Sequence, residues 1–221
     1  MKNTSWKLRR LTIMGMLVGV AYLAVFLTRI PIIPGVTFLT YEPKDALLTI
    51  GAFLIDPLAG IIMTILVAFL EFISFSETGI IGMAMNIFSS CLFVCTASII
   101  YRRKHTLLGA IIGLACGVAL STAGMLLWNY LLTPLYMNTP REAVAAMLPT
   151  VFLPFNLIKG VLNATLTMLL YKSVSSALRS AKLLPPTNTQ KSAGKYIPVV
   201  VLSAFILIGI TLALLAWNGT I

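Results

Sequence analysis

Seven long apolar stretches, separated by short polar or proline-containing segments, dominate this 221-residue sequence. Their approximate limits are residues 11–27, 46–55, 58–75, 80–100, 107–132, 143–171 and 197–217. A helix of about 20 apolar residues crosses the hydrocarbon core of a bilayer, and every stretch except the second approaches that length. The sequence therefore predicts an all-α, polytopic membrane helical bundle with six core helices and an extra C-terminal transmembrane helix.

The composition excludes several other classes of protein. Hydrophobic residues make up 59% of the chain and charged residues 10%, whereas soluble domains have about 45–50% and about 25%. A soluble fold of this size needs a polar surface that so few charged residues cannot supply. We therefore expect neither a soluble enzyme, nor a disordered chain, nor a secreted disulfide scaffold. The three cysteines lie inside apolar stretches without a nearby histidine, so we expect them to pack and to bind no metal.

The distribution of basic residues predicts the orientation of the helices. If the N-terminus is cytoplasmic and the spans alternate, 12 of the 16 Lys and Arg residues fall on the cytoplasmic side, with Asp56 as the one acidic residue there. This is the usual bias of membrane proteins, and shifting the register by one helix destroys it. The net charge of +10 therefore indicates a cytoplasmic N-terminus and not nucleic-acid binding.

The same pattern predicts the domain organisation. Residues 1–181 form a six-helix membrane domain, residues 182–195 a polar cytoplasmic linker, and residues 196–221 an additional transmembrane helix. The second apolar stretch, even counted from Pro43, spans only about 20 Å as a helix. A short helix among full-length ones leaves a recess at one face of the bundle.

Lys159 lies near the middle of the sixth stretch, in the segment Leu-Pro-Phe-Asn-Leu-Ile-Lys-Gly at residues 153–160. Ionisable residues inside a membrane are costly and usually functional. Asn156 lies three residues earlier and therefore projects from the same helix face. Either these side chains bind a polar, acceptor-rich ligand, or Lys159 is structural and pairs with a carboxylate such as Glu71 or extends outward.

Other segments are candidates for the same pocket. Asn86 follows two glycines, which allow close approach of a ligand or of another helix. Asn129 lies between a tryptophan and a tyrosine, which either anchor the membrane interface or provide stacking faces beside a ligand. The mostly apolar first outer loop, residues 31–42, is either a lid over an aromatic ligand or a segment in the lipid interface.

Small residues at helical spacing indicate close helix contacts. Gly15 and Gly19 are four residues apart on the first predicted helix, and Gly109, Gly113 and Gly117 repeat this spacing on the fifth. Such spacing lets two helix backbones approach closely. We expect the fifth-helix stripe to lie inside the bundle and the first-helix pair to contact another subunit.

The sequence lacks the motifs that several kinds of chemistry require. The sequence has no Walker-type phosphate loop and no Gly-x-Ser-x-Gly motif, and its single histidine, His105, lies in a basic loop. No carboxylate cluster is predicted at membrane depth for a metal. We therefore predict that the chain is not an enzyme, has no catalytic or metal-binding residues, and does not itself hydrolyse ATP.

Four segments, in order, carry a family resemblance. They are residues 38–45 (FLTYEPKD), Gly79 to Asn86 (Gly-x-x-Gly-x-x-x-Asn), residues 128–136 (Asn-Tyr followed by Thr-Pro-x-Tyr) and residues 153–160 (Pro-Phe-Asn-x-x-Lys-Gly). They resemble the substrate-binding (S) components of energy-coupling factor (ECF) vitamin importers, and within them the riboflavin-specific branch. The resemblance covers about residues 7–180 and is most specific in the last two segments.

The resemblance implies a bundle in a bacterial cell membrane that binds riboflavin or a related flavin from outside with high affinity. It implies partners as well: a coupling transmembrane subunit and two ATPase subunits. The flavin is then a transported ligand, and no cofactor is implied. By position, the substrate-binding residues would be Leu39, Thr40, Gly82, Asn86, Asn129, Asn156 and Lys159. Gly15 and Gly19 would dock onto the coupling subunit, where the family commonly has alanines.

Other functions stay open on the sequence alone. The chain is alternatively an S component for another vitamin, such as thiamine, folate or pantothenate. An intramembrane enzyme acting on a lipid would need a nucleophile–base pair that we do not find, and a scaffold without a ligand would leave Lys159 unexplained.

Overall fold

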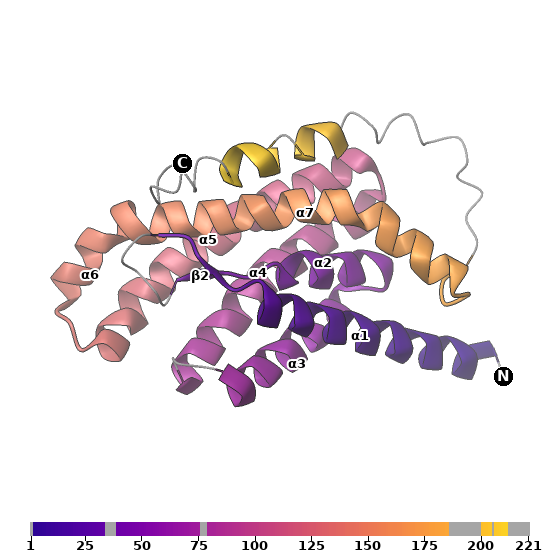
Figure 1. Ribbon diagram of the computed structural model, residues 1–221, viewed down its shortest axis with the longest axis horizontal. Coiled ribbons are helices and arrows are strands. Elements are labelled where there is room, and N and C mark those ends of the chain that lie inside the picture. Colours follow the sequence, from indigo (N-terminus) through magenta and orange to yellow (C-terminus); the bar gives the residue numbers. More distant parts are fainter. Residues whose placement is uncertain (1, 34–38, 76–78, 186–199, 205, 212–221) are drawn as a thin grey trace.

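The computed structural model describes residues 2–33, 39–75, 79–185, 200–204 and 206–211. Most helices run along the long axis of the molecule, and a small antiparallel hairpin lies among them (Figure 1). The elements are α1 (Lys2–Leu27), β1 (Ile30–Pro31), β2 (Thr40–Tyr41), α2 (Lys44–Leu54), α3 (Pro57–Phe75), α4 (Gly79–Lys104), α5 (Leu107–Met137), α6 (Arg141–Met147), the π-helical turn η1 (Leu148–Phe152) and α7 (Leu153–Ser180). A short apolar helix follows at Val200–Thr211.

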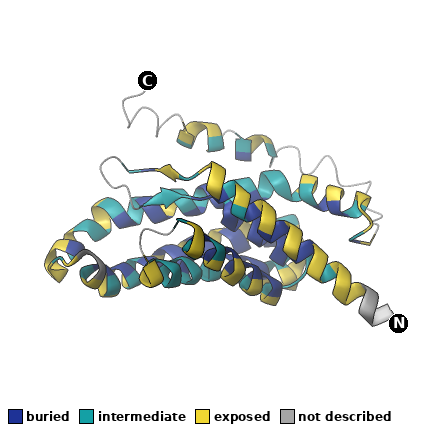
Figure 2. Cartoon of the chain, turned by 60° about the horizontal axis from the view of Figure 1, so that its bottom comes forward, coloured by how far each residue is buried: buried dark blue, intermediate teal, exposed yellow. Residues whose placement is uncertain are grey.

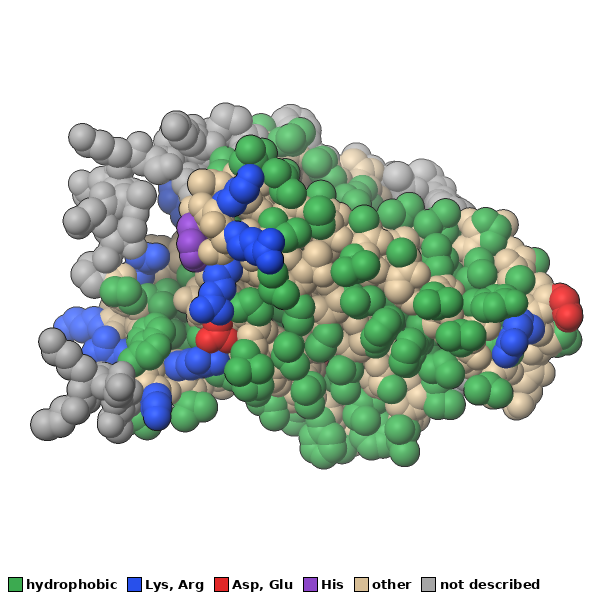
Figure 3. Space-filling view, turned by 180° about the vertical axis from the view of Figure 1, so that it is seen from behind, with side chains coloured by type: hydrophobic (Ala, Val, Ile, Leu, Met, Phe, Trp, Pro, Cys, Tyr) green, Lys and Arg blue, Asp and Glu red, His purple; other side chains and the backbone are tan. Residues whose placement is uncertain are grey.

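Five helical segments in the described residues are long and apolar enough to cross a membrane. They are Trp6–Leu27, Pro57–Phe75, Gly79–Lys104, Leu107–Leu135 and Arg141–Ser180. Figure 3 shows hydrophobic side chains over the middle of one face, with many of the Lys and Arg side chains gathered toward one end. An apolar belt of this kind is stable only where lipid surrounds it, so the predicted multi-pass membrane bundle is confirmed.

One predicted helix end is wrong. The fifth span does not close at Leu132, because α5 continues through Pro134 to Met137. A proline this close to a helix end removes only one backbone hydrogen bond, which the rest of a 31-residue helix tolerates. The prolines of the sixth stretch do not break the chain's helical path, since each stands at the first or second position of a new segment, η1 or α7, where its missing N–H costs little.

The short helix α2 lies at the centre of the bundle. It contacts α1, α3, α4 and α7, and every residue from Lys44 to Ala52 is buried. Its 11 residues span about 17 Å, roughly half of the hydrocarbon core. The space on the N-terminal side of α2 is therefore not filled by this helix. It corresponds to the recess that the sequence predicts at one face of the bundle.

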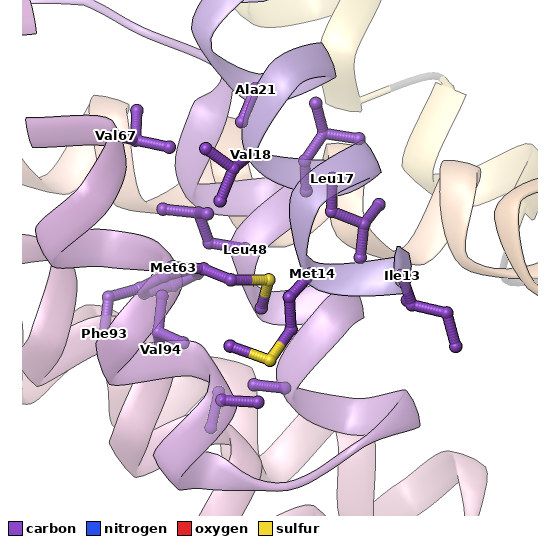
Figure 4. Close-up of a cluster of buried hydrophobic side chains, with 14 of the residues drawn as sticks. Ile13, Met14, Leu17, Val18, Ala21, Leu48, Met63, Val67, Phe93 and Val94 are labelled. Atoms are coloured by element: carbon purple, nitrogen blue, oxygen red, sulfur yellow. The ribbon is translucent and has the colours of Figure 1, made fainter. Parts of the chain in front are cut away.

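The apolar core forms between α2 and the surrounding helices. Figure 4 shows Met14 and Leu17 of α1 in the same cluster as Leu48 of α2, Met63 of α3 and Val94 of α4. Figure 2 shows that buried residues follow the inner faces of the helices and exposed residues the outer faces. Many exposed residues are themselves apolar, as expected where lipid replaces water.

The two glycine pairs have different surroundings. A Cβ added at Gly113 of α5 would lie 2.6 Å from the carbonyl oxygen of Ala97 in α4, and one at Gly117 would lie 2.9 Å from that of Phe93. The predicted close contact of the fifth-helix stripe inside the bundle is confirmed for these two positions. Gly15 and Gly19 of α1 are exposed, and an added Cβ would meet no described atom within 4 Å.

An ion pair joins α1 to the turn between α2 and α3. Arg10 Nη1 lies 2.8 Å from Asp56 Oδ2. The Asp56 side chain also accepts the backbone N–H of Ala59 at 2.7 Å and so caps the start of α3. Arg10 and Asp56 thus lie at one end of the bundle, as the charge distribution predicts.

The helix at Val200–Thr211 packs on the rest of the chain through one face. Its buried and half-buried positions recur at helical spacing, at residues 200, 203, 204, 207 and 210, whereas the other described positions are exposed. Val200 lines a small cavity together with residues of α5 and α7, such as Leu107 and Met168, and Figure 1 shows this helix beside α7. Residues 186–199 and 212–221 of the predicted linker and last helix lie outside the described residues.

Candidate ligand-binding site

A polar cavity lies near the end of the bundle opposite Arg10 and Asp56. Its lining comes from Arg29 after α1, the hairpin, the end of α3, the first turns of α4 and α7, and the part of α5 between Met125 and Thr133. All seven predicted substrate-binding residues line it: Leu39, Thr40, Gly82, Asn86, Asn129, Asn156 and Lys159. Residues up to 120 positions apart in the sequence are therefore brought to one place by the fold.

Lys159 faces this cavity without a carboxylate partner in the described part of the chain. Its predicted structural alternative, an ion pair with Glu71, is not adopted, because both oxygens of Glu71 lie within hydrogen-bond distance of Lys44. Lys159 is half-buried and belongs to the cavity wall, so it does not extend into lipid either. A half-buried ammonium group that forms no salt bridge of its own favours a ligand that accepts hydrogen bonds.

Two amide side chains beside Lys159 are held in place by backbone carbonyls of their own helices. Asn156 Nδ2 donates to the carbonyl of Phe152 at 2.7 Å, and Asn129 Nδ2 donates to that of Met125 at 2.7 Å. Asn129 Oδ1 in turn accepts from Thr133 at 2.9 Å. Each amide nitrogen carries two N–H groups, so one on each side chain is left for a ligand.

The apolar part of the lining consists mainly of phenylalanines and methionines, and it does not include the aromatic pair that flanks Asn129. Trp128 stacks on Phe88 with ring centroids 4.3 Å apart, and Tyr130 lies under Arg141. Of the two roles considered for this pair, stacking faces beside a ligand are not supported, because neither Trp128 nor Tyr130 lines the cavity. The apolar lining residues include Phe72, Phe75, Met83, Met85, Met125 and Phe155.

The hairpin closes one side of the cavity. Ile30 pairs with Tyr41, and Pro31 with Thr40, in the short antiparallel ladder. Arg29 Nε donates to Thr40 Oγ1 at 3.1 Å, and its guanidinium lies 5.5 Å from the ring centroid of Phe75. These contacts hold the strand that carries Thr40 against the end of α3. Residues 34–38 of the predicted lid, with Phe38, lie outside the described residues.

Sequence reasoning missed a buried ionic network in the cavity wall. Lys44 Nζ lies 2.6 Å from Glu42 Oε2 and 2.6 Å from Glu71 Oε1, and Asn86 Nδ2 donates to Glu71 Oε2 at 2.6 Å. Burial by itself raises the pKa of Glu42, but Lys44 and Lys159 outweigh this effect and lower that pKa below its usual range. The available signal was the charged segment 42–45 directly before a helix too short to span the membrane.

The fold and the cavity together define a membrane-embedded binding protein. The helices enclose a polar site near one end of the bundle, and the chain carries no phosphate-binding loop of its own. The chain belongs to the family of ECF transporter substrate-specific components, whose family model matches residues 9–171. The resemblance inferred from four sequence segments is therefore confirmed.

Individual relatives agree with this assignment. The chain is 28% identical over 178 residues to the riboflavin transporter RibU of Staphylococcus aureus, covering 77% of this chain and 93% of the relative. It is 26% identical over 197 residues to the riboflavin transporter FmnP of Bacillus subtilis, covering 85% and 98%. A solved structure described as the S component of a bacterial ECF transporter matches with a TM-score of 0.67 and 28% identity, covering 78% of this chain and 99% of that one.

Proposed function

We propose that this chain binds riboflavin at the outer face of a bacterial cell membrane and serves its uptake as the S component of an ECF importer. The observation that carries the proposal is Lys159, a cation in the cavity wall that forms no salt bridge with a described carboxylate. The family membership and the riboflavin transporters among the relatives support this ligand. Nothing observed favours another vitamin.

The chemistry of riboflavin matches the cavity. Its flat ring system suits the phenylalanine and methionine side chains of the lining, which gain by burying apolar surface. The ring carries carbonyl groups that accept hydrogen bonds, and Lys159, Asn129 and Asn156 have donors left for them. The ribityl hydroxyls both donate and accept, which suits Thr40 and Asn86.

The charge distribution gives the proposed orientation. With a cytoplasmic N-terminus, the basic ends of α1, α4 and α7 lie inside and the cavity lies toward the outside. The partners would be a coupling transmembrane subunit, reached through Gly15 and Gly19, and two ATPase subunits that hydrolyse ATP. The chain itself would be a carrier and not an enzyme, with riboflavin as its cargo and no bound cofactor.

The absorption spectrum of the purified protein tests the ligand. We expect flavin absorbance in the purified protein, and one-to-one quenching of riboflavin fluorescence when the ligand-free protein is titrated. Thiamine, folate and pantothenate should not compete, and riboflavin phosphate added as a competitor measures the preference between the two flavins. A protein that binds none of the flavins, or binds one of the other vitamins more tightly, contradicts the proposal.

The proposed domain division, with residues 1–181 as binding domain, 182–195 as linker and 196–221 as extra helix, makes a separate prediction. Removing residues 186–221 should leave riboflavin affinity unchanged, because no described residue beyond 185 lines the ligand cavity. The cut belongs after Pro185, since Leu184 is buried in the core and Arg179 donates to the carbonyl of Pro185.

Fluorescence titration and cell uptake of labelled riboflavin check this deletion. A cut after Lys182, which also removes Leu184, is the matched comparison and should lower the melting temperature of the protein further. Loss of riboflavin binding by the shorter deletion would show that the last helix belongs to the binding domain.

A further inference from the structure

The most buried cation of the protein lies behind the cavity wall and does not line the cavity. Lys44 exposes 1% of its side chain, and its ammonium contacts Glu42 and Glu71. Both carboxylates do line the cavity, whereas Lys44 is not among the described lining residues. Lys44 therefore cannot touch a ligand directly, yet it holds two groups that can.

Removing two carboxylates and an ammonium from water is favourable only when they are well paired. This pairing fixes the orientation of the Glu71 carboxylate. When ionised, that carboxylate accepts hydrogen bonds and donates none. Asn86 on α4 lies 2.6 Å from Glu71 Oε2, so its NH₂ group must face that carboxylate. Its carbonyl oxygen accepts no hydrogen bond from the described part of the chain and is left for the cavity.

The same network is tied to the hairpin and to α7. Asn163 of α7 exposes 1% of its surface, and its Nδ2 donates to the backbone carbonyl of Glu42 at 3.4 Å. Glu42 is thus held through its backbone by α7 and through its side chain by Lys44. Lys44 joins this fixed point to Glu71 on α3, and through Glu71 to α4.

We propose that Lys44 is a positioning residue, which through Glu71 orients Asn86 so that the α4 side of the cavity accepts hydrogen bonds while Lys159 on α7 donates them. This inference rests on the proposed binding of riboflavin in this cavity. It adds that the bound ligand presents donors as well as acceptors, as the ribityl hydroxyls do.

A double-mutant cycle with Lys44→Met and Asn86→Ala tests this role. We expect each single variant to weaken riboflavin binding by about 5–10-fold, because each loses the same hydrogen bond to the ligand. If Lys44 acts through Asn86, the double variant loses little more than either single variant. Independent effects would multiply to about 25–100-fold. Fluorescence titration of riboflavin measures all four affinities.

Two further variants separate positioning from a purely structural role. Glu71→Gln keeps the size of the side chain and should lower riboflavin affinity as Lys44→Met does. A glutamine can turn its own NH₂ group toward Asn86, so the orientation of the Asn86 amide is no longer fixed. Ser90→Ala is the matched control. Ser90 of α4 donates to Asp45 at 2.6 Å, and Asp45 lies next to Lys44 in the first turn of α2. Neither Ser90 nor Asp45 lines the cavity. This variant should lower the melting temperature and leave riboflavin affinity unchanged.

The outcomes distinguish the two proposals. Wild-type protein that binds no flavin would overturn both. Wild-type binding combined with multiplicative losses in the cycle, or with unchanged affinity in Lys44→Met and Glu71→Gln, would overturn only the positioning role of Lys44.

Discussion

Lys159→Met is expected to lower riboflavin affinity by about 1.5–3 kcal/mol, which corresponds to about a 10- to 150-fold rise in Kd. The methionine keeps much of the volume of the lysine side chain and removes only its charge and its donors. Lys159 forms no salt bridge in the described residues, but its charge acts on Glu42 beside the cavity. We therefore expect the larger effect on ligand binding, and a smaller decrease in the melting temperature of the ligand-free protein.

Lys172→Met provides the control for this change. Lys172 is an exposed lysine on the same helix, 13 residues further along and away from the ligand cavity. It should bind riboflavin as the wild type does in the same fluorescence titration. An unchanged Kd for Lys159→Met would show that the ammonium does not contact the ligand, and the proposed site would have to be abandoned.

Replacing both Gly15 and Gly19 with leucine is expected to abolish riboflavin uptake by cells while leaving riboflavin binding intact. Both glycines are exposed on α1, with no described atom near the place where a side chain would begin. The added side chains therefore fit the isolated chain, but they would prevent close approach of a second helix, which small residues permit. Uptake of labelled riboflavin and co-purification of the coupling subunit measure the effect.

Gly209→Leu is the matched control for the added side chains. Gly209 is likewise exposed, and a Cβ there would meet nothing within 4 Å, but it lies on the helix at Val200–Thr211 and not on α1. It should leave uptake and co-purification unchanged. Normal uptake by the Gly15→Leu, Gly19→Leu double variant would show that this face of α1 does not dock onto the coupling subunit.

Much of the site was predictable because its residues are exceptions to the apolar pattern. Lys159, Asn156 and Asn129 stand out in stretches that otherwise suit lipid, and a polar group at membrane depth needs a reason. Spacing alone placed Asn156 and Lys159 on one helix face, and both line the same cavity. The role of the aromatic neighbours of Asn129 stayed open in the sequence, because only the packing of α5 shows that neither of them lines the cavity.

The ionic network was not predictable in the same way. Glu42 lies just before α2 and Lys44 and Asp45 lie in its first turn, but in sequence such a charged segment is typical of an exposed loop. Their burial depends on α2 starting inside the bundle, surrounded by four other helices. The partner of Lys44, Glu71, lies 27 positions away, and no local pattern joins the two.

The sequence by itself determined that this chain is a multi-pass membrane protein, and which of its apolar stretches carry polar residues. These properties depend on hydropathy, length and charge, which act on each segment separately. Only the tertiary structure decided which charges pair with one another: it paired Glu71 with Lys44 and placed Lys159 in the cavity wall. The physical reason is that pairing energies fall off within a few ångströms, so they depend on how separate helices pack.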